Sequence, residues 1–326
     1  MKRPPLDLAR LKVRPLAERR TLLQVPEILI DPNSPAPEID EITKAAVAEA
    51  VPRIKAAQAR GASVMLMYGA HLLRNGAACL VSELMQHGYI THLATNGAGS
   101  IHDWEFSWLG ASCEKVEDNV ATGSFGTWEE TGRAIHLALK AGEARGEGWG
   151  AALGRLITED AEGFTHRWKH ASMLAEAFRL DVSASVHPGI GYDIISCHPM
   201  FDGAVLGKAA ERDFALTAGA VEGLDGGVVL VVGSAIMAPQ VFEKSLSCVH
   251  NLRFQEGRQP VQDHTIYVVD LQDGGGWDWT QGEPPKTSPA YYLRFCKSFS
   301  RMGGEMRYVQ CDNAAFVHHL HAALLR

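Results

Sequence analysis

The sequence predicts an α/β fold in which a mostly parallel sheet carries helices on both faces. Two observations lead to this prediction. Short apolar runs alternate along the chain with longer segments of helical periodicity, which is the pattern of repeated β-α-β units. Several runs, such as residues 227–232, are apolar at every position, as expected for strands that are covered on both sides.

The elements are expected in regular alternation after an N-terminal segment. Strands are expected at residues 63–67, 90–95, 182–186, 227–232, 265–269 and 306–310. Helices are expected at residues 39–59, 70–87, 127–145, 164–178, 238–252 and 288–302, and at the end of the chain up to Leu325. Parallel strands need crossover connections of about a dozen residues or more, and these helices supply them.

Residues 1–36 are predicted to form an arm, and residues 37–326 a single α/β domain. The arm is rich in Pro, Arg and Leu. Because Leu22, Leu23 and Val25 are too apolar to remain in water, we expect the arm to pack on the body or on a neighbouring subunit. The arm lacks the apolar stretch of a signal peptide.

Composition places the chain among ordinary globular proteins, with 46% hydrophobic and 21% charged residues among 326. A net charge of −7 argues against non-specific nucleic-acid binding, which needs a basic surface, and is compatible with a cationic substrate. None of the six cysteines forms a C-x-x-C pair, which fits a reducing cytosol. Because no apolar stretch approaches about 18 residues, we expect a cytoplasmic protein without a membrane span.

Small and acidic residues gather where the predicted strands end, and open parallel sheets bind ligands at these ends. Small residues let backbone N–H groups approach a pyrophosphate, helix N-termini favour its charge, and a strand-end Asp can accept hydrogen bonds from a ribose. No loop has the G-x-G-x-x-G pattern, and glycine also serves tight turns, but several such ends together indicate a dinucleotide. The residues assigned to this cofactor are Gly69, Ala70, Asn96, Gly97, Ala98, Gly99, Gly233, Ser234, Asp270 and Asp312.

Two polar clusters at strand ends are candidates for the chemistry. His102, Asp103 and Glu105 follow the strand at residues 90–95, although Asp103 could instead cap a helix and His102 could be structural. His187 and Asp193 lie in a loop shaped by a proline and two glycines, with a structural turn as the alternative. We expect His102 or His187 to act as the base and Asp193 to anchor an amine. Asp103 and Glu105 are expected to face the substrate.

Other histidines are expected to have no catalytic role. His166 and His170 are four residues apart on an expected helix, but no third ligand at a useful spacing is evident, so no metal site is predicted. The sequence contains neither a G-x-S-x-G elbow nor a P-loop.

The order of these motifs resembles that of deoxyhypusine synthase over residues 60–325. The resemblance is carried by five segments, Gly69 to Gly76, Asn96 to Asp103, Pro188 to Asp193, Gly233 to Ala235, and Cys311 to Asn313. It implies a Rossmann-like sheet, NAD as the cofactor, a polyamine substrate and a homo-oligomer, either a dimer or a tetramer. The family's catalytic lysine has its nearest counterpart in Lys297, which would form a covalent imine unless it is simply a surface residue.

A second, local resemblance is to the NAD-dependent archaeal-type ornithine cyclodeaminases. It covers Asn96 to Glu105 and the following Gly110-Ala111-Ser112, and it accounts for His102, Asp103 and Glu105. Both families begin by transferring a hydride to NAD from a carbon that bears an amine, which yields an imine.

The expected function is therefore a deoxyhypusine synthase-like, NAD-dependent oxidation of a small cationic amine or amino acid to an imine, followed by aminoalkyl transfer. Two alternatives stay open. The first is an ornithine cyclodeaminase-like enzyme that needs no covalent lysine. The second is a non-catalytic protein that binds NAD.

Overall fold

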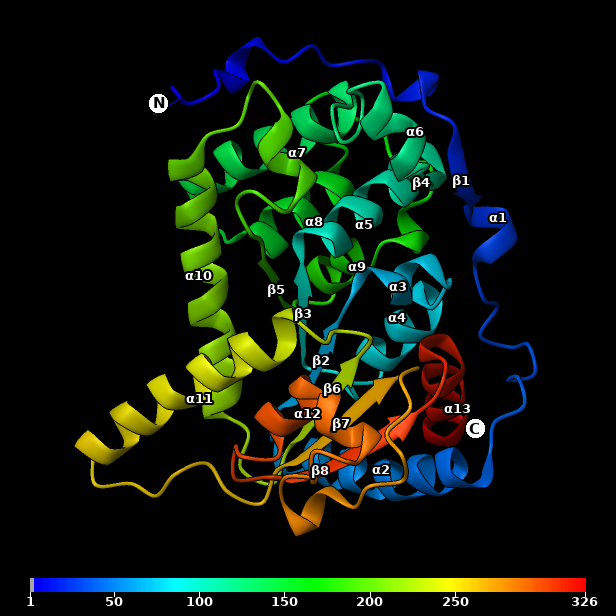
Figure 1. The fold of residues 1–326 in the computed structure, drawn as a ribbon, viewed down its shortest axis with the longest axis vertical. Coiled ribbons are helices and arrows are strands. Elements are labelled where there is room, and N and C mark those ends of the chain that lie inside the picture. Colours follow the sequence, from blue (N-terminus) through cyan, green and yellow to red (C-terminus); the bar gives the residue numbers. More distant parts are fainter. Residues whose placement is uncertain (1–2) are drawn as a thin grey trace.

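The computed structural model describes residues 3–326 and confirms the predicted fold class (Figure 1). Six parallel strands form one sheet in the order β5-β3-β2-β6-β7-β8. They are β2 (Val64–Tyr68), β3 (His92–Asn96), β5 (Ser183–His187), β6 (Val228–Val232), β7 (Thr265–Asp270) and β8 (Glu305–Gln310). Each strand begins and ends within two residues of its predicted position.

The chain builds this sheet outward from β2 in both directions. β3 and β5 are added on one side of β2, and after a crossover β6, β7 and β8 are added on the other side. This is the strand order of dinucleotide-binding Rossmann folds, and it reverses between β2 and β6. Ligands of open parallel sheets bind outside the carboxyl ends of the strands at such a reversal.

Helices cover both faces of the sheet because successive strand residues point to opposite sides. Leu66 and Tyr68 lie in one apolar core, and Met65 and Met67 lie in the other. The first core is packed by α2 (Glu41–Arg60), α3 (Ala70–Arg74), α4 (Ala78–Gln86), α5 (Gly97–Leu109), α7 (Glu129–Arg145), α8 (Trp149–Glu159), α9 (Met173–Arg179) and α13 (Asn313–Leu325). The second is packed by α11 (Met237–Gln255), α12 (Arg294–Phe299) and the end of α10 (Gly203–Glu222).

The N-terminal segment lies against its own chain. Strand β1 (Thr21–Gln24) pairs antiparallel with β4 (Ala111–Glu114), and the side chains of Leu16 and Val25 are buried. Two short helices, α1 (Val25–Ile28) and α6 (Val116–Ala121), flank this strand pair. The division into an arm and one domain stays a prediction.

Three predicted helices are wrong as continuous elements. Residues 70–87 form α3 and α4, separated at Gly76, which has a φ of +79° and lies so near the Ile28 carbonyl that a side chain would not fit. Residues 288–302 form a 3-10 turn (Pro289–Tyr292) and the short helix α12.

Residues 164–178 contain only a 3-10 turn (Lys169–Ala171) and α9. The Trp168 backbone N–H donates to the Ser107 carbonyl at 2.9 Å, which fixes the segment as a loop against α5. His166 and His170 therefore do not share a helix face. Within residues 3–326, no helix has the length and apolar character needed to cross a membrane.

Candidate functional site

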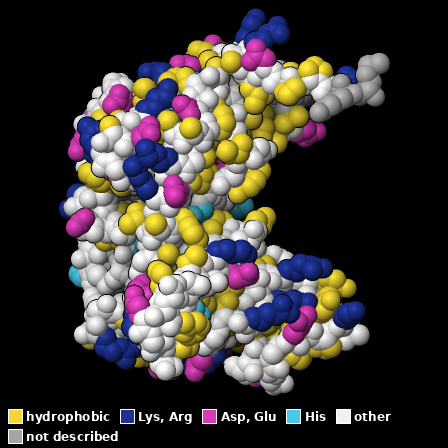
Figure 2. All heavy atoms as spheres, turned by 90° about the vertical axis from the view of Figure 1, so that its left-hand side faces the viewer, with side chains coloured by type: hydrophobic (Ala, Val, Ile, Leu, Met, Phe, Trp, Pro, Cys, Tyr) yellow, Lys and Arg dark blue, Asp and Glu magenta, His cyan; other side chains and the backbone are white. Residues whose placement is uncertain are grey.

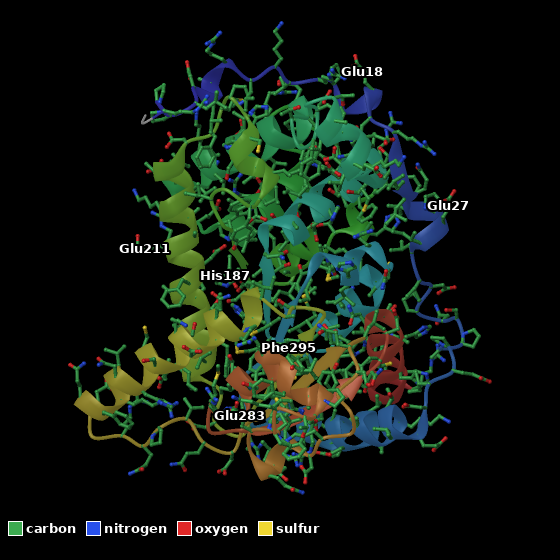
Figure 3. The ribbon with its side chains drawn as sticks, viewed as in Figure 1. Glu18, Glu27, His187, Glu211, Glu283 and Phe295 are labelled. Atoms are coloured by element: carbon green, nitrogen blue, oxygen red, sulfur yellow. The ribbon has the colours of Figure 1, made fainter. Side chains whose placement is uncertain are left out.

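The molecule is deeply hollowed at mid-height on one side, and histidine side chains lie inside the hollow (Figure 2). His187, which ends β5, lies at the same height in the ribbon view (Figure 3). The hollow therefore lies at the level where β5 ends, and the sheet topology predicts a ligand at the carboxyl ends of the strands.

The loops that follow β2 and β6 touch at the point where the strand order reverses. A Cβ at Gly69 would lie 2.1 Å from the Gly233 carbonyl oxygen, so a side chain does not fit there. Gly233 has a φ of +62°, and a Cβ on it would lie 2.2 Å from the Asn313 side chain. Ser234 is also buried here, and its Oγ accepts the N–H of Ala238 at 3.3 Å. A dinucleotide site needs such a close approach of backbone without side chains, and the cofactor role assigned to Gly69, Gly233 and Ser234 stays a prediction.

The start of α5 is already occupied by acceptors from the chain itself. Asn96 Oδ1 accepts the Gly99 N–H at 2.8 Å, and the backbone N–H of Ala98 donates to the Asp193 carboxylate. A Cβ at Gly97 would lie 2.3 Å from this carboxylate. Gly97 thus makes room for Asp193, and the cofactor role assigned to residues 96–99 stays a prediction.

The remaining cofactor candidates lie at the same edge of the sheet. Asp270 Oδ1 accepts the Gln272 N–H at 3.0 Å, and Ala70 begins α3 directly after β2. Asp312 Oδ1 caps α13 by accepting the N–H groups of Ala314 and Ala315 at 3.0 and 2.9 Å. Their proposed contacts with NAD also stay predictions.

A cavity of about 290 Å³ lies at this edge, between α3, α5 and the loop after β5. Four predicted site residues line it, namely Ala98, His102, Glu105 and Asp193, together with Arg19 and Arg74. Its volume is near the lower end, about 300 Å³, of ligand pockets, so it suits a small molecule rather than a whole dinucleotide. Two larger hollows, of about 840 and 870 Å³, lie at the amino ends of the strands and beside α11, away from the carboxyl edge.

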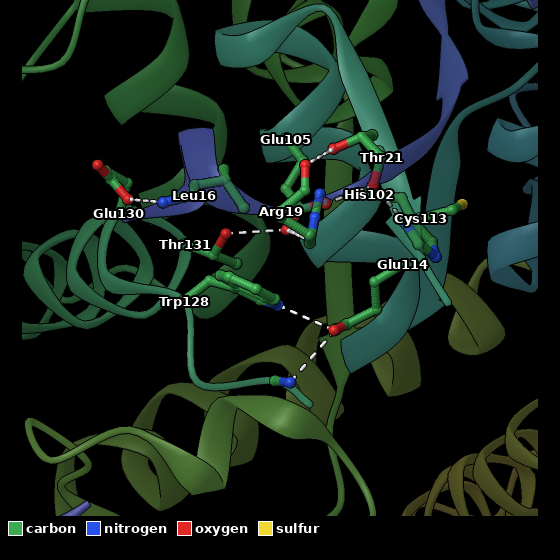
Figure 4. A network of polar contacts seen from close by, with 12 residues as sticks. Leu16, Arg19, Thr21, His102, Glu105, Cys113, Glu114, Trp128, Glu130 and Thr131 are labelled. Atoms are coloured by element: carbon green, nitrogen blue, oxygen red, sulfur yellow. Dashed lines mark hydrogen bonds and ion pairs between the residues drawn. The ribbon is translucent and has the colours of Figure 1, made fainter. Parts of the chain in front are cut away.

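A chain of polar contacts orients His102 in this cavity (Figure 4). The Arg19 guanidinium donates to both Glu105 oxygens at 2.8 and 2.7 Å. The Ser112 hydroxyl donates to Glu105, and its oxygen lies 2.7 Å from His102 Nδ1. Because the hydroxyl proton is used on the carboxylate, Nδ1 carries the hydrogen and donates it to Ser112. Nε2 is then the unprotonated nitrogen, and no side chain or backbone group of residues 3–326 forms a hydrogen bond with it.

Arg19, Glu105 and Ser112 form a relay of contacts to His102, and burial and neighbouring charges determine the charge states of its members. Burial is the main reason that the pKa of His102 is lowered to about 4; the charge of Glu105 opposes this shift, and the charges of Arg74 and Arg19 add to it. Burial alone would raise the pKa of Glu105, but the charge and hydrogen bonds of Arg19 outweigh it and bring this pKa below its ordinary value. At neutral pH, His102 is therefore an uncharged base supported by a charged carboxylate. Burial raises the pKa of Asp193.

His187 belongs to a different cluster from His102. Its Nε2 lies 3.1 Å from Ser185 Oγ and 3.0 Å from Thr217 Oγ1, which is on α10. Both hydroxyls can donate to backbone carbonyls, so the Nε2–H of His187 donates to them. Burial lowers the pKa of His187 to about 4, which leaves it neutral as well. His187 is not among the residues that line the cavity.

Lys297 and Asp103 also do not line the cavity. Lys297 Nζ donates to Glu283 Oε1 at 2.7 Å and lies 3.2 Å from the centre of the Tyr291 ring. Asp103 is fully buried and accepts the Ser172 hydroxyl and, at 2.8 Å, the Met173 N–H, so it supports the start of α9. The covalent imine assigned to Lys297 and the substrate contact assigned to Asp103 stay predictions that this geometry does not favour.

Several residues of the site were not predicted from the sequence. Arg19 reaches Glu105 across 86 positions of the chain, so no local pattern links the two. Ser112 follows Gly110 in the resemblance to the cyclodeaminases and could have been found there. Cys113 lies 3.9 Å from His102 Nδ1 with a φ of +72°, a strained conformation for a residue with a side chain.

Comparison with known proteins shows similarity of fold. No protein-family profile matches the chain, and no curated protein matches its sequence. Unliganded AgrE has a TM-score of 0.52 at 15% identity over 88% of this chain and 33% of AgrE. The ternary complex of AgrE with ornithine and NAD⁺ has a TM-score of 0.52 at 14% identity, over 88% of this chain and 34% of that one.

An LOR/SDH-type protein from Methanococcus maripaludis S2 has a TM-score of 0.51 at 14% identity, over 96% of this chain and 76% of that protein. The chain thus spans about a third of the length of AgrE and three quarters of the LOR/SDH-type protein. A deoxyhypusine synthase from Entamoeba histolytica gives a TM-score of only 0.46 at 7% identity, so it adds no argument.

Proposed function

We propose that this protein is an NAD-dependent enzyme that oxidises a small amine or amino acid to an imine. The observation that carries the proposal is the neutral His102, held with its Nε2 lone pair free by the relay of Arg19, Glu105 and Ser112. The Rossmann strand order supports a dinucleotide site at the same edge of the sheet. AgrE, whose fold is similar, forms a complex with ornithine and NAD⁺.

The residues of the cavity match the needs of this reaction. An ammonium group must lose a proton before its carbon can release a hydride, and His102 Nε2 accepts that proton. Asp193 attracts and holds the cationic end of the substrate. The loops at Gly69 and Gly233, which have no room for side chains, would hold NAD, which supplies the hydride acceptor when bound.

Among the reactions that begin with an imine, the geometry favours a cyclodeaminase-like course. Aminoalkyl transfer through a lysine imine would need a free, uncharged Lys297, whereas Lys297 is paired with Glu283 at 2.7 Å and packed on Tyr291. A trapped or hydrolysed imine needs no such lysine. The homo-oligomeric state and the cytoplasmic location stay predictions.

Binding and turnover can be tested separately. Isothermal titration with NAD⁺ and NADH should show binding, and incubation with NAD⁺ and basic amino acids should release ammonia. His102→Gln should keep the affinity for NAD⁺ and lower kcat by about 10²- to 10⁴-fold, since it removes the base. His170→Gln, at an exposed position, is the matched control and should change neither.

The outcomes separate the alternatives. If neither NAD⁺ nor NADH bound, the proposal would fail in every form. If NAD⁺ bound but no amine or amino acid were oxidised, the protein would be a non-catalytic NAD-binding protein. A borohydride-trapped adduct that is lost in Lys297→Ala would instead support aminoalkyl transfer.

A further inference from the structure

Arg74 is a cation of the cavity that no carboxylate neutralises within residues 3–326. It lies at the end of α3 and lines the cavity together with His102 and Asp193. Its Nη1 is 3.5 Å from His71 Nε2, at the limit of a hydrogen bond, and its Nε is buried without any partner. A half-buried guanidinium that lacks a counter-ion is costly, so this site favours an anionic ligand.

Arg19 supplies the other guanidinium of the cavity, and it is already paired with a carboxylate. Arg19 donates to both oxygens of Glu105, and that carboxylate also accepts from Ser112 and from Thr131 at 2.8 Å. Arg19 therefore belongs to the relay, and Glu105 already neutralises its charge. Glu114, which also lines the cavity, accepts from Asn119 and Trp128 at 2.6 and 3.0 Å.

We propose that Arg74 binds the carboxylate of the substrate, so that the site takes amine-bearing carboxylic acids and rejects polyamines. The planar guanidinium matches a carboxylate with two parallel hydrogen bonds. Asp193, which lines the same cavity, suits the ammonium group, so a small zwitterion satisfies both charges. A polyamine would place a second ammonium beside Arg74, where like charges repel. The inference rests on the proposed function only for the reaction that follows binding.

A phosphate of the dinucleotide could also pair with the Arg74 guanidinium, as a carboxylate does. The carboxylate is favoured because Arg74 lies close enough to His102 to lower its pKa, and His102 is the base of the proposed reaction. The small volume of the cavity, about 290 Å³, also suits an amino acid. The experiment below separates the two sources of anion.

The test uses pairs of ligands that differ only by a carboxylate. L-ornithine with putrescine, L-lysine with cadaverine and L-arginine with agmatine are titrated into the whole protein, with and without NADH. In the wild type, at least one amino acid should bind 10-fold or more tightly than its amine. Arg74→Gln should weaken the binding of that amino acid by about 10- to 100-fold and leave the affinity for the amine unchanged or slightly higher.

Two further variants keep the result interpretable. Arg74→Lys retains the charge but lacks the two parallel N–H donors of the guanidinium. We expect its affinity for the amino acid to lie between those of the wild type and Arg74→Gln. Arg20→Gln removes an exposed arginine of the N-terminal segment and should bind every ligand as the wild type does.

Several outcomes would overturn the inference. They are equal binding of each amine and its amino acid, no binding of any amino acid in the set, and an Arg74→Gln variant that keeps the preference. An equal loss of NAD⁺ affinity in Arg74→Gln would show that Arg74 holds a phosphate. If the wild type preferred amino acids but never bound NAD⁺ or NADH, the proposed function would fail while the carboxylate anchor would stand.

Discussion

At the scale of single residues, the pair of Arg19 and Glu105 determines the geometry of the site. Their side chains are only 2% and 1% exposed, and the nitrogen and oxygen lie 2.7 Å apart. Such a pair adds little stability compared with two apolar residues, but removing one partner leaves a buried charge uncompensated. Loss of either Arg19 or Glu105 would therefore disrupt the chain of contacts that orients His102.

Glu105→Gln should destabilise the protein by about 3–5 kcal/mol, because Arg19 would keep its charge in a buried place. The free energy of unfolding in urea measures this effect. Asp118→Asn is the matched control: it breaks the exposed ion pair with Lys115 and should cost at most about 1 kcal/mol. Equal effects of the two substitutions would show that burial does not determine the strength of the pair.

Asp213 gives a prediction about pH. Its Oδ2 accepts the N–H groups of Val186 and Gly150 at 2.7 and 3.0 Å, and Oδ1 is buried without a partner. Burial raises its pKa from 3.8 to about 7. Since the folded pKa is the higher one, its protonated form stabilises the fold fully below pH 3.8, and this stability is lost as the pH rises through about 7.

Asp213→Asn keeps an oxygen acceptor and carries no charge at any pH. It should therefore raise the free energy of unfolding by a few kcal/mol at pH 8 relative to the wild type, and by much less at pH 5. Urea unfolding of both proteins at the two pH values measures the difference. A substitution effect that is the same at pH 5 and pH 8 would contradict the shifted pKa.

At the scale of elements, the loop after β6 is held in one conformation by its contacts. Gly233 and Gly257 both have a positive φ, +62° and +70°, but only Gly233 is crowded, by Asn313. Gly233→Ala should cost about 2–4 kcal/mol, whereas Gly257→Ala should cost about 1 kcal/mol, the strain of the left-handed backbone alone. Thermal unfolding of the two variants compares them, and equal costs would mean that the loop can move aside.

The sheet was predictable from the sequence because its strands are buried on both faces and read as short apolar runs. Helix α10 was missed although it has 20 residues, because only five of its positions are buried and the apolar periodicity is weak. The pairing of β1 with β4 was missed for another reason. Leu23 meets Ser112 across almost 90 residues, and such long-range pairing leaves no local pattern.

The candidate site was predictable from the sequence only in part. His102, Glu105 and Asp193 follow neighbouring strands, β3 and β5, and parallel strands bring their ends to one edge. Arg19 and Arg74 come from elements whose packing brings them to the cavity, and only the folded chain shows them there. His187 was placed at the right edge, but strand alternation directs it toward Thr217 on α10.

At the scale of the whole molecule, exposed apolar side chains gather at the edge that carries the site. Ile190 follows β5, Ile236 follows β6 and Leu271 follows β7, and they are 62%, 74% and 67% exposed. Exposed apolar side chains at the carboxyl edge of a parallel sheet suit the flat rings of a dinucleotide. Of these residues, Ile236 lies nearest in the chain to the loop of Gly233 and Ser234, where we propose that the pyrophosphate lies.

This arrangement predicts how NAD⁺ should stabilise the protein. NAD⁺ at 100 times its Kd should stabilise the wild type by about 2.7 kcal/mol, which thermal unfolding detects as a rise in Tm. Ile236→Asp places a negative charge beside the proposed pyrophosphate and should weaken NAD⁺ by about 10-fold or more, so the stabilisation at the same concentration falls by about 1.4 kcal/mol. Leu252→Asp, which lies near the far end of α11 and is 58% exposed, is the matched control and should keep the full rise. An equal rise in both variants would place the dinucleotide away from the reversal between β2 and β6.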